Sequence, residues 1–461
     1  MMMPTRLTIL VATTFAAAAG LVLYAQNPPT PPASQPPVTE IVTKITGSPG
    51  LPPKYAVPDF IAPGGDAESI AAGKVLGQVL WDDLNFEREF YLISRDTYRS
   101  IPQPASLDRV ALDRWKEIGT EGLVIGSVRK AGAGFVVQMK LIEVGSGRAA
   151  LARDYSGGAS TSARFFAHTI SDEIHQQQVQ LRGVARTKLA FTSDRDGERI
   201  KGPTASRDIQ NIYTADYDGA NQRRVTTTRS LDITPQWSPD AKSLAYTSYR
   251  TGFPDIFIAD MTGRRPLQNP AKGTPEKQNY LPAWSPDGSK LAFMSPRDGN
   301  PEIYVVNRDG SGLRRLTNHP ENDVTPTWSP TGNQIAFTSN RNGNPQIWIM
   351  NADGSGQQRI TSESWCDRPT WSPAPFNEIA YASRSGGGYN IRIFDFATRS
   401  TRTVTDGVGS NESPAFSPNG RHIAYTSSRA GKSQIFTIAR DGLGLRQITT
   451  QGENRYPHWS N

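Results

Sequence analysis

The stretch that decides the fold is Pro282-Ala-Trp-Ser-Pro-Asp-Gly-Ser-Lys-Leu-Ala-Phe293. Its Pro-x-Trp-Ser-Pro opening recurs along the chain, once with Phe in place of Trp and once shortened to Pro-x-Trp-Ser. The six aromatic residues are 43 to 47 positions apart. A repeat of this length fits the four short strands and the turns of one propeller blade. The other copies are found at 235–239, 326–330, 369–373, 414–418 and 457–460.

Turn signals divide each copy into short strands. In the second copy, Asp287-Gly288 follows the aromatic element, and Asp309-Gly310 comes after two further runs. The first run, Lys290–Phe293, is mostly apolar, and the second, Glu302–Val305, is rich in β-branched and aromatic residues. Asp-Gly pairs between such runs are strong hairpin signals. Each copy therefore predicts four antiparallel strands.

The two ends of the repeat region are half units. The first unit begins at Lys188–Phe191 without its own Trp-Ser-Pro strand, and the element at 457–460 has no strands after it. If the two halves pair, they complete one blade and leave the ring without a free edge. The alternative is an open array with apolar surface exposed at both ends. We therefore predict a mainly β protein with a six-bladed β-propeller over residues 183–461.

Residues 54–182 alternate between helix and strand patterns and predict a small α/β domain before the propeller. We expect helices over residues 67–80, capped by Asp66, over 107–118, and over 162–178. Strands are expected at 122–128, 135–144 and 149–155. The buried side of the first helix is expected to comprise Ile70, Val75, Leu76, Val79 and Leu80.

The N-terminal residues read as an export signal. Arg6 precedes an apolar stretch, and Leu23-Tyr24-Ala25 offers a cleavage site, so residues 1–25 are predicted to be a cleaved signal peptide. The alternative is a retained membrane anchor, because the stretch is just long enough to span a bilayer. Residues 26–53 are rich in proline and predict an extended linker. Within it, residues 38–46 form a β-prone run that could add a strand to a partner sheet or pack on its own domain.

Composition argues against several function classes. The formal charge is +7, but the basic residues are scattered rather than gathered in a dense run, so we expect no nucleic-acid partner. His168 and His175 are seven residues apart without a third ligand, and we expect surface or packing roles for them. Cys366 is the only cysteine, and we expect it to be inert. No hydrolase or nucleotide-binding motif is present, so we expect a non-enzymatic monomer.

The residues just before each Pro-x-Trp vary while the strands around them repeat. The first strand of a propeller blade is innermost, so these residues are expected at one mouth of the central channel, where variation on a constant scaffold favours a binding surface. The alternative is plain loop variation. The predicted protein-binding residues are Asp232, Ile233, Gln278, Asn279, Tyr280, Leu281, Asp323, Val324, Asp367, Arg368, Asn411, Glu412, Arg455 and Tyr456.

Five of the six positions three residues before the proline are Asp or Asn. Five such oxygens around a channel could hold a calcium ion, and no other cofactor is predicted. The alternative is that these side chains cap the loops through Asx turns. They are Asp232, Asn279, Asp323, Asn411 and Asn454.

The repeats together with the preceding domain resemble the TolB family. The propeller repeats alone are shared with other proteins, including peptidase propellers, but the N-terminal segments match this family in order and spacing. The resemblance covers roughly residues 38–460. The matching N-terminal segments are Tyr55–Phe60, Trp115–Gly119, Gly122–Gly126, Ala167–Ile174 and the junction Gly183–Phe191.

This resemblance implies a periplasmic protein of the Tol–Pal system. In the family the propeller binds the peptidoglycan-associated lipoprotein Pal, and the mature N-terminus binds the inner-membrane protein TolA. These two contacts together support outer-membrane integrity and cell division. The family's Pal-contact positions match Gln278, Leu281 and Val324, although these differ in type from the family's residues. The proline-rich spacer before residues 38–46 also departs from the family pattern. An alternative function is a propeller enzyme, or a glycan- or peptide-binding protein, that uses the same mouth.

Overall fold

The computed structural model describes residues 44–45, 51–158, 161–201 and 206–461. The predicted signal peptide, most of the linker and most of the 38–46 run lie outside these residues. The described residues from Lys44 onward belong to one compact unit. Among them, no helix combines the length and the apolar character that a membrane crossing requires.

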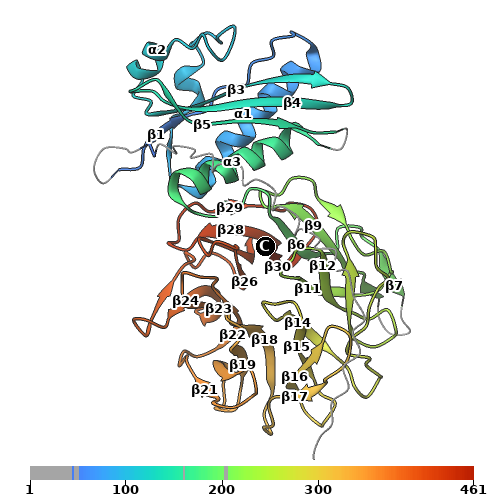
Figure 1. Cartoon of the computed structure of the whole chain (residues 1–461). Helices are drawn as coiled ribbons and strands as arrows, with labels where there is room; N and C mark the ends of the chain where they lie inside the picture. The colour runs from blue at the N-terminus through green and yellow to red at the C-terminus, as the bar shows by residue number, and fades with distance from the viewer. Residues whose placement is uncertain (1–43, 46–50, 159–160, 202–205) are drawn as a thin grey trace, which may run out of the picture. The chain divides into compact units, whose positions relative to one another are not determined.

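The N-terminal domain is a five-stranded sheet with two long helices on one face. Its strand order is β2-β1-β3-β4-β5, and Figure 1 shows α1 and α3 lying together along one side of it. Helix–sheet packing buries Tyr55, Leu76 and Phe166, while Trp115 and Tyr98 cover the opposite face. The elements are β1 Lys54–Ala56, α1 Ala67–Glu87, β2 Tyr91–Leu92, the short 3-10 helix η1 Arg95–Tyr98, α2 Leu112–Glu117, β3 Gly122–Ala131, β4 Gly134–Glu143, β5 Arg148–Ser156 and α3 Ala163–Val179.

Two helix predictions need correction. The first helix does not end at residue 80 but continues to Glu87, because Asp83 is buried against the next domain instead of ending the helix. Its Ile70 and Val75 are 43% and 41% exposed, so the buried stripe is narrower than the sequence predicted. The second helix is only α2, Leu112–Glu117, because residues 107–111 form turns and non-helical backbone instead.

The propeller consists of six sheets that follow one another along the chain (Figure 1). In blades two to six the innermost strand carries the Pro-x-aromatic element. The Asp-Gly and related turns lie between strands, as the repeat predicted, but the second blade has three strands instead of the predicted four. The strands of these five blades are β11 Asp232–Trp237, β12 Ser243–Ser248, β13 Asp255–Asp260; β14 Tyr280–Trp284, β15 Lys290–Ser295, β16 Glu302–Asn307, β17 Arg314–Arg315; β18 Asp323–Trp328, β19 Gln334–Ser339, β20 Gln346–Asn351, β21 Gln358–Arg359; β22 Cys366–Trp371, β23 Glu378–Ser385, β24 Gly388–Asp395, β25 Ser400–Thr403; and β26 Asn411–Phe416, β27 His422–Ala430, β28 Lys432–Ala439, β29 Arg446–Gln447.

The remaining blade joins the two half units, which confirms the predicted closure. Its strand order is β10-β9-β6-β30, so the last strand, β30, pairs antiparallel with β6. The Trp459 indole N–H donates to Thr187 Oγ1 at 2.6 Å, and the Ser460 amide donates to Lys188 O at 2.8 Å. The strands of this blade are β6 Lys188–Ser193, β9 Asn211–Asp216, β10 Arg223–Arg224 and β30 Asn454–Trp459, with a side hairpin of β7 Arg199–Lys201 and β8 Ser206–Asp208.

The end of α1 contacts the propeller through buried polar groups. Asp83 accepts a hydrogen bond from the Tyr217 hydroxyl at 2.6 Å and lies 2.8 Å from His168 Nδ1. Glu87 accepts from the Val184 amide at 2.8 Å and from the Asn419 side chain at 3.1 Å. His168 thus packs inside this contact rather than on the surface, and His175 is buried as well.

Candidate protein-binding mouth of the propeller channel

Each innermost strand bulges at the residue before its proline. Six such residues have φ between +49° and +57°, and the strand register shifts at the same place in every blade. This conformation is costly for side chains with a Cβ, above all β-branched ones, so its sixfold repetition shows that the ring imposes it. The bulge residues are Thr234, Leu281, Thr325, Arg368, Ser413 and Tyr456.

The bulges direct these six side chains to the centre of the ring. They line a cavity of about 80 Å³, together with Gln236 and the prolines that follow five of them. We call this cavity the throat. The sequence singled out Leu281, Arg368 and Tyr456 but did not single out Thr234, Thr325 and Ser413. All six occupy one register position of the repeat, but no shared residue type marks that position as the one that faces the channel.

Hydroxyl groups tie neighbouring blades together at the bulges. The amides of Thr234, Leu281 and Tyr456 donate to a threonine hydroxyl of the preceding blade at 3.1 to 3.3 Å. The Thr338 hydroxyl likewise donates to Asp367 of the next blade at 3.0 Å. A mouth held in this way is preorganised, so a partner would meet a fixed shape.

The six residues that directly precede the bulge residues form a ring around the throat, and their side chains are half-buried or exposed. We call this ring the rim. Its members differ from blade to blade in charge, size and polarity, although the backbone beneath them is the same. Gln278 lies beside the rim, and its side chain accepts a short hydrogen bond from the Tyr280 hydroxyl. The rim residues are Ile233, Tyr280, Val324, Asp367, Glu412 and Arg455.

The Asp and Asn residues three positions before the proline lie inside the blades, not at the mouth. Asp232, Asn279, Asp323 and Asn411, predicted as binding residues, have no exposed surface. Asp232 accepts from Ser230 and Thr228 at 3.0 and 2.8 Å, and the Asn411 side chain donates to Val408 O at 3.3 Å. Such bonds stabilise the loops, because a buried polar group needs a partner.

The oxygens of these five side chains accept hydrogen bonds from residues of their own blades, whereas a calcium site would need them to face the channel. The calcium site stays a prediction. Among the described residues, no group of three or more His, Cys, Asp or Glu side chains is placed to hold a metal ion. Cys366 occupies the equivalent position in the fifth blade of the chain order and is fully buried. Burial, with Glu363 nearby, raises the pKa of its thiol to about 12.

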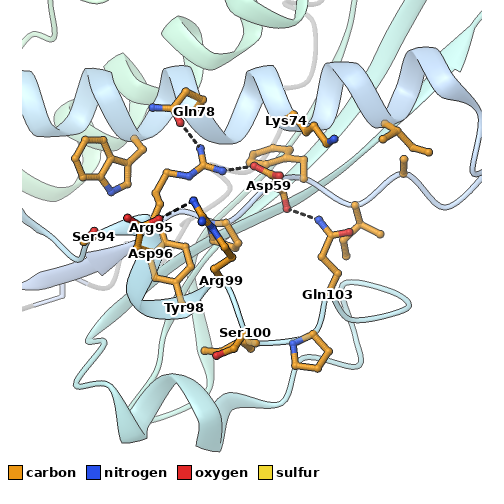
Figure 2. A pocket seen from close by; sticks show the side chains of 18 residues that line it. Asp59, Lys74, Gln78, Ser94, Arg95, Asp96, Tyr98, Arg99, Ser100 and Gln103 are labelled. Carbon is orange, nitrogen blue, oxygen red and sulfur yellow. Dashed lines mark hydrogen bonds and ion pairs between the residues drawn. The ribbon is translucent and has the colours of Figure 1, made fainter.

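A larger cavity of about 950 Å³ lies in the N-terminal domain, between α1 and the segment that contains η1 (Figure 2). Arg95 pairs with Asp59 and donates to Gln78 Oε1 at 3.2 Å, and Gln103 donates to Asp59 O at 3.2 Å. Most of the charged side chains that line this cavity are therefore paired with an opposite charge. The channel mouth, where side-chain identity varies on a repeated scaffold, is the better candidate for partner recognition.

Comparison with known proteins agrees with this architecture. The sequence model of the TolB beta propeller domain matches residues 176–461, and that of the TolB amino-terminal domain matches residues 42–150. The chain belongs to the TolB family. The crystal structure of TolB from Acinetobacter baumannii superposes on it with a TM-score of 0.71 and 27% identity, covering 90% of this chain and 98% of that one.

Curated family members show a closer but shorter match. A Tol-Pal system protein TolB from Desulfosudis oleivorans is 34% identical over 212 residues, which is 46% of either chain. One from Haemophilus ducreyi is 32% identical over 237 residues, which is 51% of either chain. The matched region thus spans about half the length of these relatives.

Proposed function

We propose that this TolB-family chain is a non-enzymatic periplasmic adaptor of the Tol–Pal system. Its propeller mouth would bind a Pal-like peptidoglycan-associated lipoprotein, and its N-terminal segment a TolA-like inner-membrane protein. The two contacts together would support outer-membrane integrity and invagination during division. One observation carries the proposal: six side chains that differ in charge, size and polarity are displayed next to six equivalent bulges around one channel.

The composition of the mouth fits a protein partner. Tyr280, Tyr456 and Arg455 are of the residue types that anchor protein interfaces, and Leu281 and Val324 add apolar contact next to them. All five are half-buried or exposed. The blades below hold them in fixed positions, so little conformational entropy would be lost on binding.

The N-terminal contact rests mainly on residues that the structure does not describe. Only Lys44 and Ile45 of the 38–46 run are placed. Ile45 is 3% exposed, and its amide donates to Gln178 Oε1 at 3.0 Å. This supports a run that packs partly on its own domain, and it leaves residues 38–43 as the segment we assign to a TolA-like partner. Export through residues 1–25 is part of the same proposal.

The test is a double substitution at the mouth, Leu281→Asp with Val324→Asp, in the full mature chain. Asp tolerates the +55° φ of Leu281 better than most residues, so the fold should survive. We expect binding to the soluble domain of the Pal-like lipoprotein, measured by calorimetry, to weaken at least about 30-fold, because hot-spot losses are about 2 kcal/mol or more. Leu313→Asp with Leu445→Asp is the matched control, since these leucines are 46% and 43% exposed on outer turns.

Each alternative outcome is informative. Wild-type affinity in a folded double variant would reject the mouth as the lipoprotein site. If the wild-type chain does not bind the lipoprotein but hydrolyses a glycan or peptide, the enzyme alternative would be favoured instead.

A further inference from the structure

The throat contains one charged side chain. Its lining consists of hydroxyl, amide, apolar and proline side chains apart from Arg368. The nearest opposite charge is Asp367, whose Oδ2 lies 3.9 Å from Arg368 Nε. That carboxylate already accepts the Thr338 hydroxyl at 3.0 Å and the Arg368 amide at 2.7 Å. Both of these hydrogen bonds end on Oδ1, and Asp367 itself lies outside the throat, so the lining of the throat carries one positive charge and no negative one.

The guanidinium of Arg368 is positioned but not hydrogen-bonded. It lies over the Tyr456 ring, with 4.6 Å between its central carbon and the ring centroid, and the side chain is 27% exposed. The described residues provide no hydrogen-bond partner for its side-chain N–H groups. A guanidinium carries five donors in a fixed fork that matches a carboxylate.

A second unsatisfied group belongs to the same throat. Ser413 is 7% exposed, and among the described residues its hydroxyl has no hydrogen-bond partner. It occupies the bulge position of β26, the strand between those of Arg368 and Tyr456, and β26 contacts both neighbouring strands. A buried hydroxyl without a partner is destabilising, so a ligand that forms a hydrogen bond with it would be favoured.

We propose that the throat is an anion-binding site that accepts a single carboxylate. Arg368 would supply a charge-assisted pair of hydrogen bonds and Ser413 a third donor, in a half-buried site. The volume of about 80 Å³ admits one carboxyl group but not a sugar or an aromatic ring, since pockets for such ligands span about 300 to 1,000 Å³. The same charge disfavours the calcium ion that the sequence suggested for this channel.

The ligand we assign is an Asp or Glu side chain of the protein seated on the rim. This part rests on the proposed function, whereas the anion site itself does not. In such a complex the rim would contact the partner's surface around one acidic residue, and the side chain of that residue would enter the throat. Arg368 would then be a specificity-determining residue, because a neutral or basic residue at that point would cover the guanidinium without offering its N–H groups a hydrogen-bonded carboxylate.

The anion site is tested with bromide, which anomalous diffraction locates directly. Crystals of the full mature chain soaked in sodium bromide should show an anomalous peak in the throat, beside Arg368 and Ser413. Arg368→Gln should abolish this peak, whereas Arg455→Gln, a rim arginine outside the throat, should leave it intact. An empty throat in the wild-type crystal, or an equal peak in Arg368→Gln, would overturn the proposal.

A second arm tests the assigned ligand in solution. Arg368→Gln should lower the affinity for the Pal-like lipoprotein at least about tenfold, which is the effect of losing one charge-assisted contact. Arg368→Lys should restore part of that affinity. Unchanged affinity in Arg368→Gln would overturn the acidic side chain as ligand. Wild-type protein that fails to bind the lipoprotein, with bromide still in the throat, would overturn the proposed partner and leave the anion site established.

Discussion

Glu87 should make the stability of this protein fall as the pH rises through neutrality. The carboxyl group is 4% exposed where α1 meets the propeller, and burial raises its pKa from an ordinary 4.5 to about 8. The folded protein therefore holds a proton near pH 7 that the unfolded chain has released. Glu87 thus favours folding most below pH 4.5, and this advantage is lost as the pH rises towards 8. Glu87→Gln, which stays neutral, removes the effect.

The magnitude can be worked out in a window where the histidines do not interfere. Burial lowers the pKa of His175 and His458 to about 4 and of His422 to about 3, so they cost stability chiefly below pH 6.5. Between pH 6.5 and 8 the Glu87 effect is largely unopposed by them. A shift of one pKa unit corresponds to about 1.4 kcal/mol, so wild type should lose roughly 1.5 kcal/mol relative to Glu87→Gln across this window.

The assay is urea unfolding of both proteins at pH 6.5, 7.25 and 8, and the quantity compared is the difference in their free energies of unfolding. Gln at position 87 keeps an acceptor for the Val184 amide, so the variant should fold. The same substitution at Glu117, whose side chain is 63% exposed, should leave the wild-type pH dependence unchanged. Parallel stability curves for wild type and Glu87→Gln would refute the reasoning, and a wild type that gains stability relative to Glu87→Gln as the pH rises would reverse it.

Three further outcomes follow from the same structure. Trp459→Ala should lower the free energy of unfolding by about 3 to 5 kcal/mol in urea titrations, because it removes a buried ring and the bond to Thr187 at the ring closure; a loss below 1 kcal/mol would show that the closing strand is not needed. Asp83→Ala should cost about 3 kcal/mol in the same titrations, because the Tyr217 hydroxyl and His168 lose their shared buried partner. Cys366 should not react with a thiol reagent at pH 8 until urea unfolds the chain, since its buried thiol has a pKa of about 12; fast reaction of the native protein would contradict its burial.

Periodicity made the propeller predictable. Six aromatic elements 43 to 47 residues apart fixed the blade count, and the two half units fixed the closure that Trp459 and Thr187 now show. The end of the first helix was not predictable in the same way. Asp83 reads as a polar helix terminus until its partners, His168 and Tyr217, are known, and these come from other parts of the chain.

The candidate site was only half predictable for a related reason. Variation before each proline located the mouth, but sequence alone does not show which of three adjacent side chains faces the channel. Asp232 and Asn411 were predicted at the mouth because they lie just before the Pro-x-aromatic element, yet both are fully buried in their blades, two residues before the bulge. The same bulge brings Thr234 and Ser413 into the throat. Six positive φ angles decide this arrangement, and no residue type in the sequence signals them.

Hydrogen–deuterium exchange of the full mature chain, with and without the soluble domain of the Pal-like lipoprotein, tests the central claim most directly. The account predicts slower exchange in the six short segments at the mouth, with the outer strands of the blades unchanged. Protection confined to the outer strands, or to the cavity between α1 and η1, would contradict it. The six segments are 232–234, 279–281, 323–325, 366–368, 411–413 and 454–456.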